Sequence, residues 1–156
     1  MTTDRKQVAL VTGGRSGIGQ ACARNLASQG IRVFTAQRQD DPEFDSICTD
    51  LADTDAPRQI IEHITEHAGQ LDILINNAGI LRDKTFAKLE PQDLEAVVDV
   101  HLKGAFFVSQ PAFRVMKENG YGRFLFTASA AGIFGNFGQS NYGAAKMGLV
   151  GLSNVL

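Results

Sequence analysis

The chain has 156 residues, which is enough for one domain with a hydrophobic core. A formal net charge of -2 leaves no basic footprint and argues against nucleic-acid binding, and no stretch approaches the roughly 20 apolar residues of a membrane span. The polar start does not resemble a secretory signal, and two cysteines, Cys22 and Cys48, are too few for a disulfide framework, so both are expected as reduced thiols in a cytoplasmic protein.

Short apolar runs alternate with longer helical stretches along the chain. The continuous apolar run at residues 8–11 is typical of a strand buried on both faces, and the first helical stretch ends at Gly30. The expected strands are residues 8–11, 31–36, a brief one at 47–48, 71–75 and 123–127, with an irregular segment at 40–46. The expected helices are residues 17–29, 54–68, 91–117 with a break at Gly104, and 140 onward.

This alternation predicts an α/β fold, a parallel sheet with helices on both faces. Ligands of such sheets bind beyond the carboxyl ends of the strands, so Gly13, Asn76 and Ser129 are expected on one rim. No linker or repeat is evident, and residues 1–156 are expected to form one domain. If the last strand lies at the sheet edge, its apolar residues 124–126 border an unpaired ladder. The chain is therefore expected to be a piece of a longer protein.

A glycine-rich turn at residues 12–19 joins the first strand to the first helix. Glycines permit a tight turn and let the backbone approach a pyrophosphate, and the helix N-terminus offers free N–H groups and a partial positive charge. The context favours a dinucleotide site over an ordinary βα turn. The expected contacts are Gly13, Arg15, Ser16, Gly17, Ile18 and Gly19.

The end of the second strand distinguishes NAD from NADP. A carboxylate there binds the ribose 2′-hydroxyl of NAD, whereas an arginine accommodates the 2′-phosphate of NADP. Here Arg38 follows Gln37, the first carboxylate is Asp40, and Arg15 is a second candidate for the phosphate. The sequence favours NADP, with NAD as the alternative cofactor and a solvated Arg38 as the alternative interpretation.

Polar residues also follow the third and fourth strands. Asp50, next to Leu51, either accepts a hydrogen bond from an adenine amino group or caps the next helix. In the block Asn76-Asn77-Ala78-Gly79, small residues let the chain run beside a cofactor, and asparagine side chains can brace neighbouring backbone. The expected cofactor contacts are Asn77, Ala78 and Gly79. An ordinary turn is the alternative, because Asn and Gly favour turns.

Ser129 precedes Tyr142 and Lys146, which lie four residues apart. A helix presents residues at this spacing on one face, so a phenol and an ammonium can share a pocket. With the glycine-rich turn, these residues indicate hydride transfer between a nicotinamide and an alcohol or ketone. The alternative is a pair on the helix surface.

These motifs, in this order, resemble the short-chain dehydrogenase/reductase family along essentially the whole chain. The resemblance implies a Rossmann-like, doubly wound parallel sheet in three α/β/α layers. It also implies a nicotinamide cofactor and a homotetramer or homodimer built partly through residues 103–117 and 140 onward. Family members have roughly 250 residues, so the final third is expected to be missing.

The resemblance also implies roles for the site residues. Tyr142 is expected to act as general acid in ketone reduction and as base in alcohol oxidation. Ser129 would hold the substrate oxygen, and Lys146 would orient the nicotinamide ribose and favour ionised Tyr142. Most family members have an asparagine at the position of His101. A catalytic role for His101 and a buried core histidine are the two alternatives.

Residues 132–142 resemble a narrower subgroup, the 3-oxoacyl reductases and (3R)-hydroxyacyl-CoA dehydrogenases. The predicted reaction is the NADP-dependent interconversion of a ketone, including a 3-oxoacyl thioester, and a secondary alcohol. The alternatives are an NAD(P)-dependent sugar or small-alcohol dehydrogenase and a non-catalytic dinucleotide-binding protein. The expected partner is a small-molecule carbonyl or alcohol, with no nucleic acid and no membrane. No metal is expected, because His63 and His67 are best interpreted as a solvated helix face.

Overall fold

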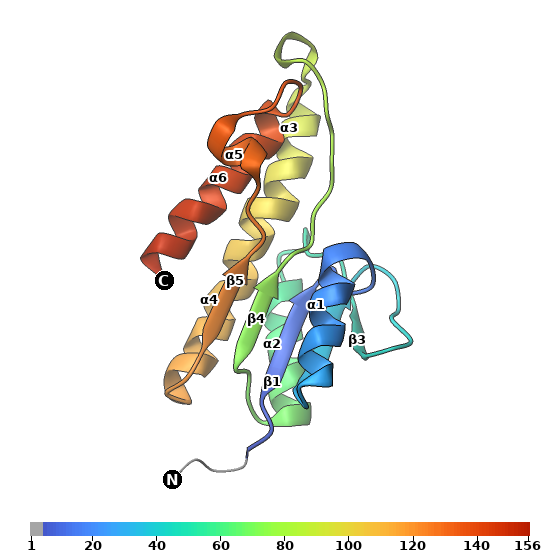
Figure 1. Cartoon of the computed structure of the whole chain (residues 1–156), viewed down its shortest axis with the longest axis vertical. Helices are drawn as coiled ribbons and strands as arrows, with labels where there is room; N and C mark the ends of the chain where they lie inside the picture. The colour runs from blue at the N-terminus through green and yellow to red at the C-terminus, as the bar shows by residue number, and fades with distance from the viewer. Residues whose placement is uncertain (1–4) are drawn as a thin grey trace.

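The computed structural model describes residues 5–156 and contains one sheet of five parallel strands (Figure 1). The strand order is β3-β2-β1-β4-β5, so the direction of strand addition reverses between β1 and β4. The strands are β1 (Val8–Thr12), β2 (Arg32–Gln37), β3 (Asp45–Cys48), β4 (Ile73–Asn76) and β5 (Arg123–Phe126).

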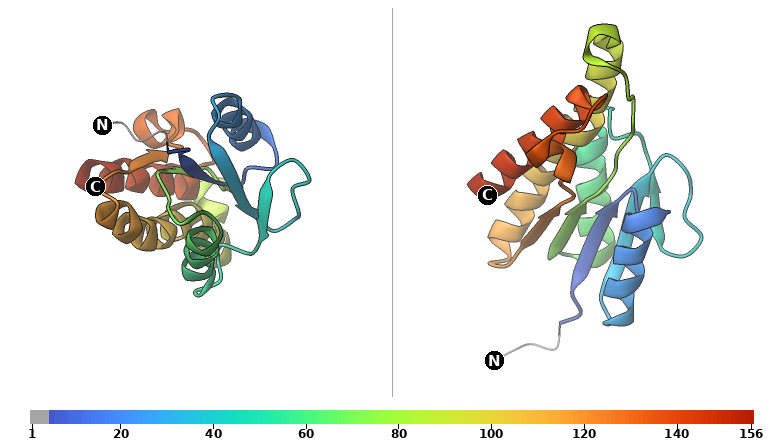
Figure 2. Two further views of the ribbon diagram at one scale, coloured as in Figure 1. Left: turned by 90° about the horizontal axis from the view of Figure 1, so that it is seen from below. Right: turned by 45° about the horizontal axis from the view of Figure 1, so that its top comes forward.

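Helices cover both faces of this sheet. In Figure 2, α1 lies on one side of the strands, and α2 and α4 lie on the other. The predicted three-layer α/β/α fold is confirmed. The helices are α1 (Gly17–Ser28), α2 (Ala56–Ala68), η1 (Phe86–Lys88), α3 (Pro91–Val98), the π-helical η2 (Asp99–Lys103), α4 (Gly104–Glu118), α5 (Ala130–Phe134) and α6 (Ser140–Val155).

The two faces of the sheet have separate hydrophobic cores. Along β1, Val8 and Leu10 join the core under α2 and α4, whereas Ala9 and Val11 join the smaller core under α1. Successive side chains of a strand point to opposite faces, so both faces need apolar residues. This explains why the run at residues 8–11 is continuously apolar.

Four elements differ from the sequence-based expectation. Strand β3 begins at Asp45, inside the segment expected to be irregular, because Asp45 already pairs with Phe34 of β2. The Ser46 hydroxyl also accepts hydrogen bonds from the Asp41 N–H and the Gln37 side chain. The break expected at Gly104 is instead a π-helical turn just before it, so the chain stays helical from Pro91 to Glu118. The short helices η1 and α5 were not predicted, since a single turn leaves little periodic signal.

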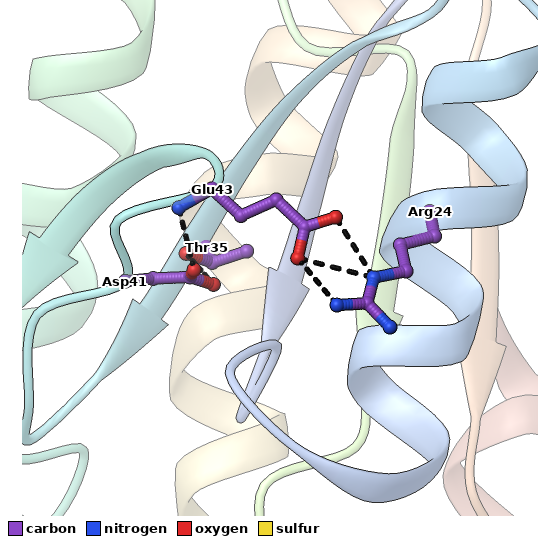
Figure 3. Close-up of polar contacts among 4 residues, drawn as sticks. All are labelled: Arg24, Thr35, Asp41 and Glu43. Carbon is purple, nitrogen blue, oxygen red and sulfur yellow. Dashed lines mark hydrogen bonds and ion pairs between the residues drawn. The ribbon is translucent and has the colours of Figure 1, made fainter.

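A polar cluster ties the loop between β2 and β3 to α1 (Figure 3). The Arg24 guanidinium makes two parallel hydrogen bonds of 2.8 Å to the Glu43 carboxylate. The buried Asp41 carboxylate accepts from the Thr35 hydroxyl at 3.2 Å and from the Glu43 N–H at 3.0 Å. Because β2 holds one end of this loop and the cluster holds the other, Arg38 has a defined place beside the glycine-rich turn.

Strand β5 lies at the edge of the sheet, as expected. Leu125 is 48% exposed on the α1 side, where no helix covers it within residues 5–156. On the opposite side, the Phe124 ring stacks between Phe113 of α4 and Phe126, with ring-centre distances of 6.3 Å to each. No helix in the same range of residues is long and apolar enough to cross a lipid bilayer.

The larger core should dominate the stability of the fold. Ile64 of α2 is fully buried there, so Ile64→Ala is expected to lower the free energy of unfolding by about 2–5 kcal/mol. Ile18→Ala removes the same atoms from a side chain that is 64% exposed. This change should alter the free energy of unfolding by less than about 1 kcal/mol. Chemical denaturation without cofactor measures both values, and equal losses would contradict this assignment of the core.

Candidate active site

The glycine-rich turn has a backbone that only glycine fits closely. Gly13 and Gly17 have φ of 65° and 55°, in the left-handed region that side chains disfavour. A Cβ on Gly19 would lie 2.2 Å from the Gly13 carbonyl oxygen, and one on Gly14 would lie 2.4 Å from Thr35 Cγ2. The turn is therefore bare backbone at the start of α1, where free N–H groups can face an anion.

Asn77 fastens the next segment of the rim to this turn. Its Nδ2 donates to the carbonyl oxygens of Thr12 and Gly13, both at 3.2 Å. The Thr12 hydroxyl in turn accepts from the N–H groups of Asn77 and Ala78 at 3.0 and 3.1 Å. The expectation that asparagine braces neighbouring backbone is confirmed for Asn77.

One end of the rim holds a cavity of about 390 Å³ that contains several of the predicted residues. Asp50 does not cap α2, whose N-cap is Asp55, so the capping alternative is wrong. Its carboxylate instead accepts from the Ala52 N–H at 3.0 Å and stays beside the cavity. The lining residues that matter here are Gly13, Arg38, Asp50, Leu51, Ala78 and Gly79.

A second cavity, of about 510 Å³, continues along the rim to α6. It shares Gly13, Ala78, Gly79 and Ile80 with the first, so the two form one groove. Its other lining residues include Ser16, Ile18, Asn77, His101, Thr127, Tyr142 and Lys146. Arg15 lies to the side, in a hollow shared with Arg38 and Gln39, where its guanidinium donates to the Gln39 side chain.

Tyr142 and Lys146 line the second cavity together. The Lys146 ammonium lies 5.6 Å from the centre of the Tyr142 ring and donates to the Thr127 carbonyl oxygen at the end of β5. Lys146 is only 3% exposed, and this burial lowers its pKa to about 8. The site thus holds a poorly solvated cation beside a phenol.

His101 lies in the π-helical turn and is buried beside Tyr142. Its Nε2 is 2.7 Å from the Ile80 carbonyl oxygen and 3.0 Å from the Ile80 nitrogen, and its ring meets the Tyr142 ring edge-on at 5.2 Å. Burial lowers the pKa of His101 below its usual value, while the hydrogen bond to Ile80 opposes this. A Cβ on Gly79 would lie 2.2 Å from the histidine Cε1, so this ring needs glycine at position 79.

A small internal cavity lies behind Lys146. Its lining includes Asn76, His101 and Lys146. The Asn76 side chain donates to the Ser109 hydroxyl at 3.0 Å, but its Oδ1 has no partner within residues 5–156, and neither has His101 Nδ1. Buried polar atoms normally have partners, so the space behind Lys146 is polar.

Ser129 stands at the N-cap of α5, where its hydroxyl accepts from the Ala131 N–H at 3.2 Å. Thr127, and not Ser129, is the residue of this segment that lines the second cavity. Helix α5 packs so closely on α6 that a Cβ on Gly143 would lie 2.9 Å from the Ala131 carbonyl oxygen. The serine is thus held near the start of α6 with its hydroxyl proton free to donate.

Sequence reasoning missed Thr127, Ile80 and Asn141. Thr127 and Ile80 contribute backbone groups, which leave no trace in residue types. Asn141 had a signal, since it lies four residues before the buried Ala145 on α6 and so occupies a core position of the helix.

The remaining candidates do not form a metal or disulfide site. On α2, the His63 and His67 rings stack 4.0 Å apart, and His67 Nδ1 bonds to the His63 carbonyl oxygen. No group of three metal-ligating side chains occurs in the part of the chain that the structure describes. Cys22 and Cys48 are free thiols.

Known proteins with similar sequences include two that are named as reductases. The family described as short chain dehydrogenase matches residues 7–156. A peroxisomal multifunctional enzyme type 2 from Drosophila melanogaster is 41% identical over 96% of this chain and 28% of its own length. An acetoacetyl-CoA reductase from Acinetobacter is 37% identical over 97% of this chain and 67% of its own. A 3-oxoacyl-[acyl-carrier-protein] reductase from Synechocystis is 34% identical over 100% and 69%. The chain thus spans under a third of the Drosophila relative.

The buried lysine predicts a pH dependence of folding. Because the pKa of Lys146 falls from 10.5 to about 8 on folding, the unfolded chain binds more protons between these values. The free energy of unfolding should therefore rise between pH 8 and 10.5, by roughly 1–3 kcal/mol relative to Lys146→Met. Chemical denaturation of the cofactor-free proteins across this range measures the difference.

Lys103→Met is the control, because Lys103 is exposed and Asp99 raises the pKa of its ammonium. The same comparison with this variant should show no rise over that pH range. Parallel curves for wild type and Lys146→Met would contradict the effect of burial.

Proposed function

Because this chain belongs to the short-chain dehydrogenase family, we propose that it is an NADP-dependent oxidoreductase that interconverts a ketone and a secondary alcohol. The observation that carries the proposal is that Tyr142 and Lys146 line the end of a groove that begins at the glycine-rich turn. The relatives named as acetoacetyl-CoA and 3-oxoacyl reductases support a 3-oxoacyl thioester as the ketone.

The groove suits a nicotinamide dinucleotide along its whole length. The backbone at Gly13 and at the start of α1 suits the diphosphate, and a Cβ on Gly13 or Gly19 would crowd the turn. Asp50 and Leu51 suit the adenine end, and Asn77, Ala78 and Gly79 line the middle. When bound, the cofactor supplies a hydride to the carbonyl carbon or accepts one from the alcohol.

NADP is favoured over NAD by the charge near the ribose. The exposed Arg15 and Arg38 border one hollow beside the glycine-rich turn, and no carboxylate lines it. Two guanidinium groups suit a 2′-phosphate, to which each can donate paired hydrogen bonds.

Tyr142 is proposed as the general acid and base. In reduction its hydroxyl gives a proton to the carbonyl oxygen, and in oxidation the phenolate takes the proton of the alcohol. Lys146 stabilises that phenolate. Its ammonium lies 5.6 Å from the centre of the Tyr142 ring, and a positive charge this close favours the charged form of the phenol. Ser129 is proposed to hold the substrate oxygen with its free hydroxyl proton.

His101 is proposed to support this pair from behind. Its Nε2 holds the Ile80 backbone, its Nδ1 has no partner within residues 5–156, and the residue lines the small cavity that Lys146 also lines. A histidine in this place can exchange protons with the lysine as Tyr142 changes charge.

The oligomeric state and the cellular compartment are proposed as the sequence predicts them. Exposed Phe106, Phe107 and Phe113 on α4, and Met147 on α6, support a homodimer or homotetramer formed partly through these helices. Two free thiols suit a reducing compartment such as the cytoplasm.

Tyr142→Phe is the test of the reaction. The variant keeps the ring and removes the proton, so turnover of a short 3-oxoacyl thioester with NADPH should fall by at least ~100-fold. NADPH binding, measured by fluorescence, should stay within about twofold. Tyr121→Phe, which removes the chain's other tyrosine hydroxyl, is the control and should keep wild-type turnover. Near wild-type turnover of Tyr142→Phe would refute the assignment. NADPH binding without turnover by the wild-type protein would favour a non-catalytic dinucleotide-binding protein.

Arg38→Ala tests the choice of cofactor. Loss of one charged contact to the 2′-phosphate should raise KM for NADPH by ~10-fold or more and leave KM for NADH within about twofold. Steady-state kinetics with both cofactors measures the change. Arg58→Ala removes an exposed arginine from α2 and should affect neither value. Equal KM changes for NADPH and NADH in Arg38→Ala would count against a 2′-phosphate contact.

A further inference from the structure

Asn141, directly before Tyr142, is a buried polar residue that the proposed mechanism does not use. It is 1% exposed and shares one stripe of α6 with Ala145 and Leu149, which are 1% and 2% exposed. An apolar side chain would be ordinary at such a position. A carboxamide here loses its hydration and needs hydrogen-bond partners within the protein.

The Asn141 carboxamide joins three separate segments. Its Nδ2 donates to the Arg82 carbonyl oxygen at 3.0 Å and to the Asp93 carbonyl oxygen at 3.2 Å. Its Oδ1 accepts from the Tyr142 N–H at 2.8 Å. Carbonyl oxygens only accept, so the amide must point its nitrogen at Arg82 and Asp93. The start of α6 is thereby bonded to the segment after β4 and to the first turn of α3.

Weaker contacts surround this buried amide. The Lys84 N–H donates to the Gly138 carbonyl oxygen at 2.9 Å, and the Gln139 side chain donates to Asp83 at 2.8 Å. The Lys84 ammonium pairs with the Asp93 carboxylate at 2.7 Å. The Lys84 side chain is 44% exposed and the bond between Gln139 and Asp83 is exposed, so water competes with both contacts. These contacts together form a junction between the start of α6, the first turn of α3 and residues 82–84, and the Asn141 carboxamide is the part of it that is shielded from water.

The junction fixes two sides of the second cavity relative to each other. Ile80 and Leu81, just before Arg82, line that cavity on one side, and Tyr142 lines it on the other. The His101 ring holds Ile80 as well and meets Tyr142 edge-on. A shift at the start of α6 would move the phenol relative to the whole Ile80–Arg82 segment.

We propose that Asn141 is a positioning residue that sets where the Tyr142 hydroxyl stands in the cavity. The inference rests on the proposed role of Tyr142. Proton transfer needs a donor within hydrogen-bond reach of the reacting oxygen, and a displacement of ~1 Å can slow such a reaction by ~100-fold. Cofactor binding along the glycine-rich turn does not involve these contacts.

Asn141→Asp is the most selective test in the full-length protein. The change keeps the size of the side chain and the acceptor for Tyr142 N–H, but it turns an oxygen toward two carbonyl oxygens. We expect kcat for a short 3-oxoacyl thioester to fall by ~10-fold or more and the Kd for NADPH to stay within about twofold. Deuterium exchange of the backbone amides of residues 81–84 and of Tyr142 should become faster.

Asn136→Asp is the matched control. It adds the same charge shortly before α6, but the Asn136 side chain is exposed, and its one hydrogen bond within residues 5–156 goes to the Gln139 side chain, at 2.9 Å. This variant should keep kcat and amide exchange close to wild type. An equal fall in kcat in both aspartate variants would indicate an effect of charge and overturn the proposal. If Asn141→Asp does not fold, Asn141→Ser keeps one donor and should show a smaller fall in kcat, again with an unchanged Kd.

Amide exchange separates this inference from the proposed function. If the wild-type protein reduces no carbonyl compound, the proposed function fails, and exchange alone then decides whether Asn141 holds the two segments together. Unchanged exchange at residues 81–84 and Tyr142 in the Asn141 variants would overturn the inference, even with an active wild-type enzyme. Wild-type kcat in an Asn141 variant would overturn it as well.

Discussion

The close approach of two backbone segments, the glycine-rich turn and residues 76–79, underlies the whole site. Asn77 bonds to the carbonyl oxygens of Thr12 and Gly13, and Thr12 bonds back to the Asn77 N–H. The approach is possible because Gly19 has no Cβ, which would lie 2.5 Å from Asn77 Nδ2. The parallel sheet brings β1 and β4 side by side, and these hydrogen bonds hold together the two segments that follow the strands and line the groove. Tyr142 and Lys146 line the far end of this groove, so their proposed role depends on it.

Local sequence signals sufficed for the framework. Apolar runs, glycines at helix starts and the rule that parallel sheets bind ligands at their carboxyl edge predicted the layers, the rim and the glycine-rich end of the groove. The resemblance to a known family supplied His101 and the roles of the catalytic residues. These signals work because strand alternation and turn geometry depend on neighbours in the chain. The predicted start of β3 was wrong, because the first residues of this strand pair with Phe34 and Thr35 of β2, and a partner distant in sequence leaves no local signal.

The finer parts of the site depend on groups that are distant in sequence. The partner of His101 is the backbone of Ile80, and every residue type has a backbone, so no pattern could reveal it. The π-helical turn that holds His101 was expected as a break at Gly104, because periodicity cannot resolve one extra residue in a helical turn. Asn141 contacts Arg82 and Asp93, and only the assembled fold brings these residues together. A polar residue at a core position was the available hint.

The fit between Gly79 and His101 restricts how related sequences can differ. The imidazole occupies the volume that any side chain at position 79 would need, so a larger residue at position 79 would clash with the His101 ring as it is placed here. An alanine at position 79 would require the His101 ring, which Ile80 also holds, to move or to be replaced by a smaller side chain.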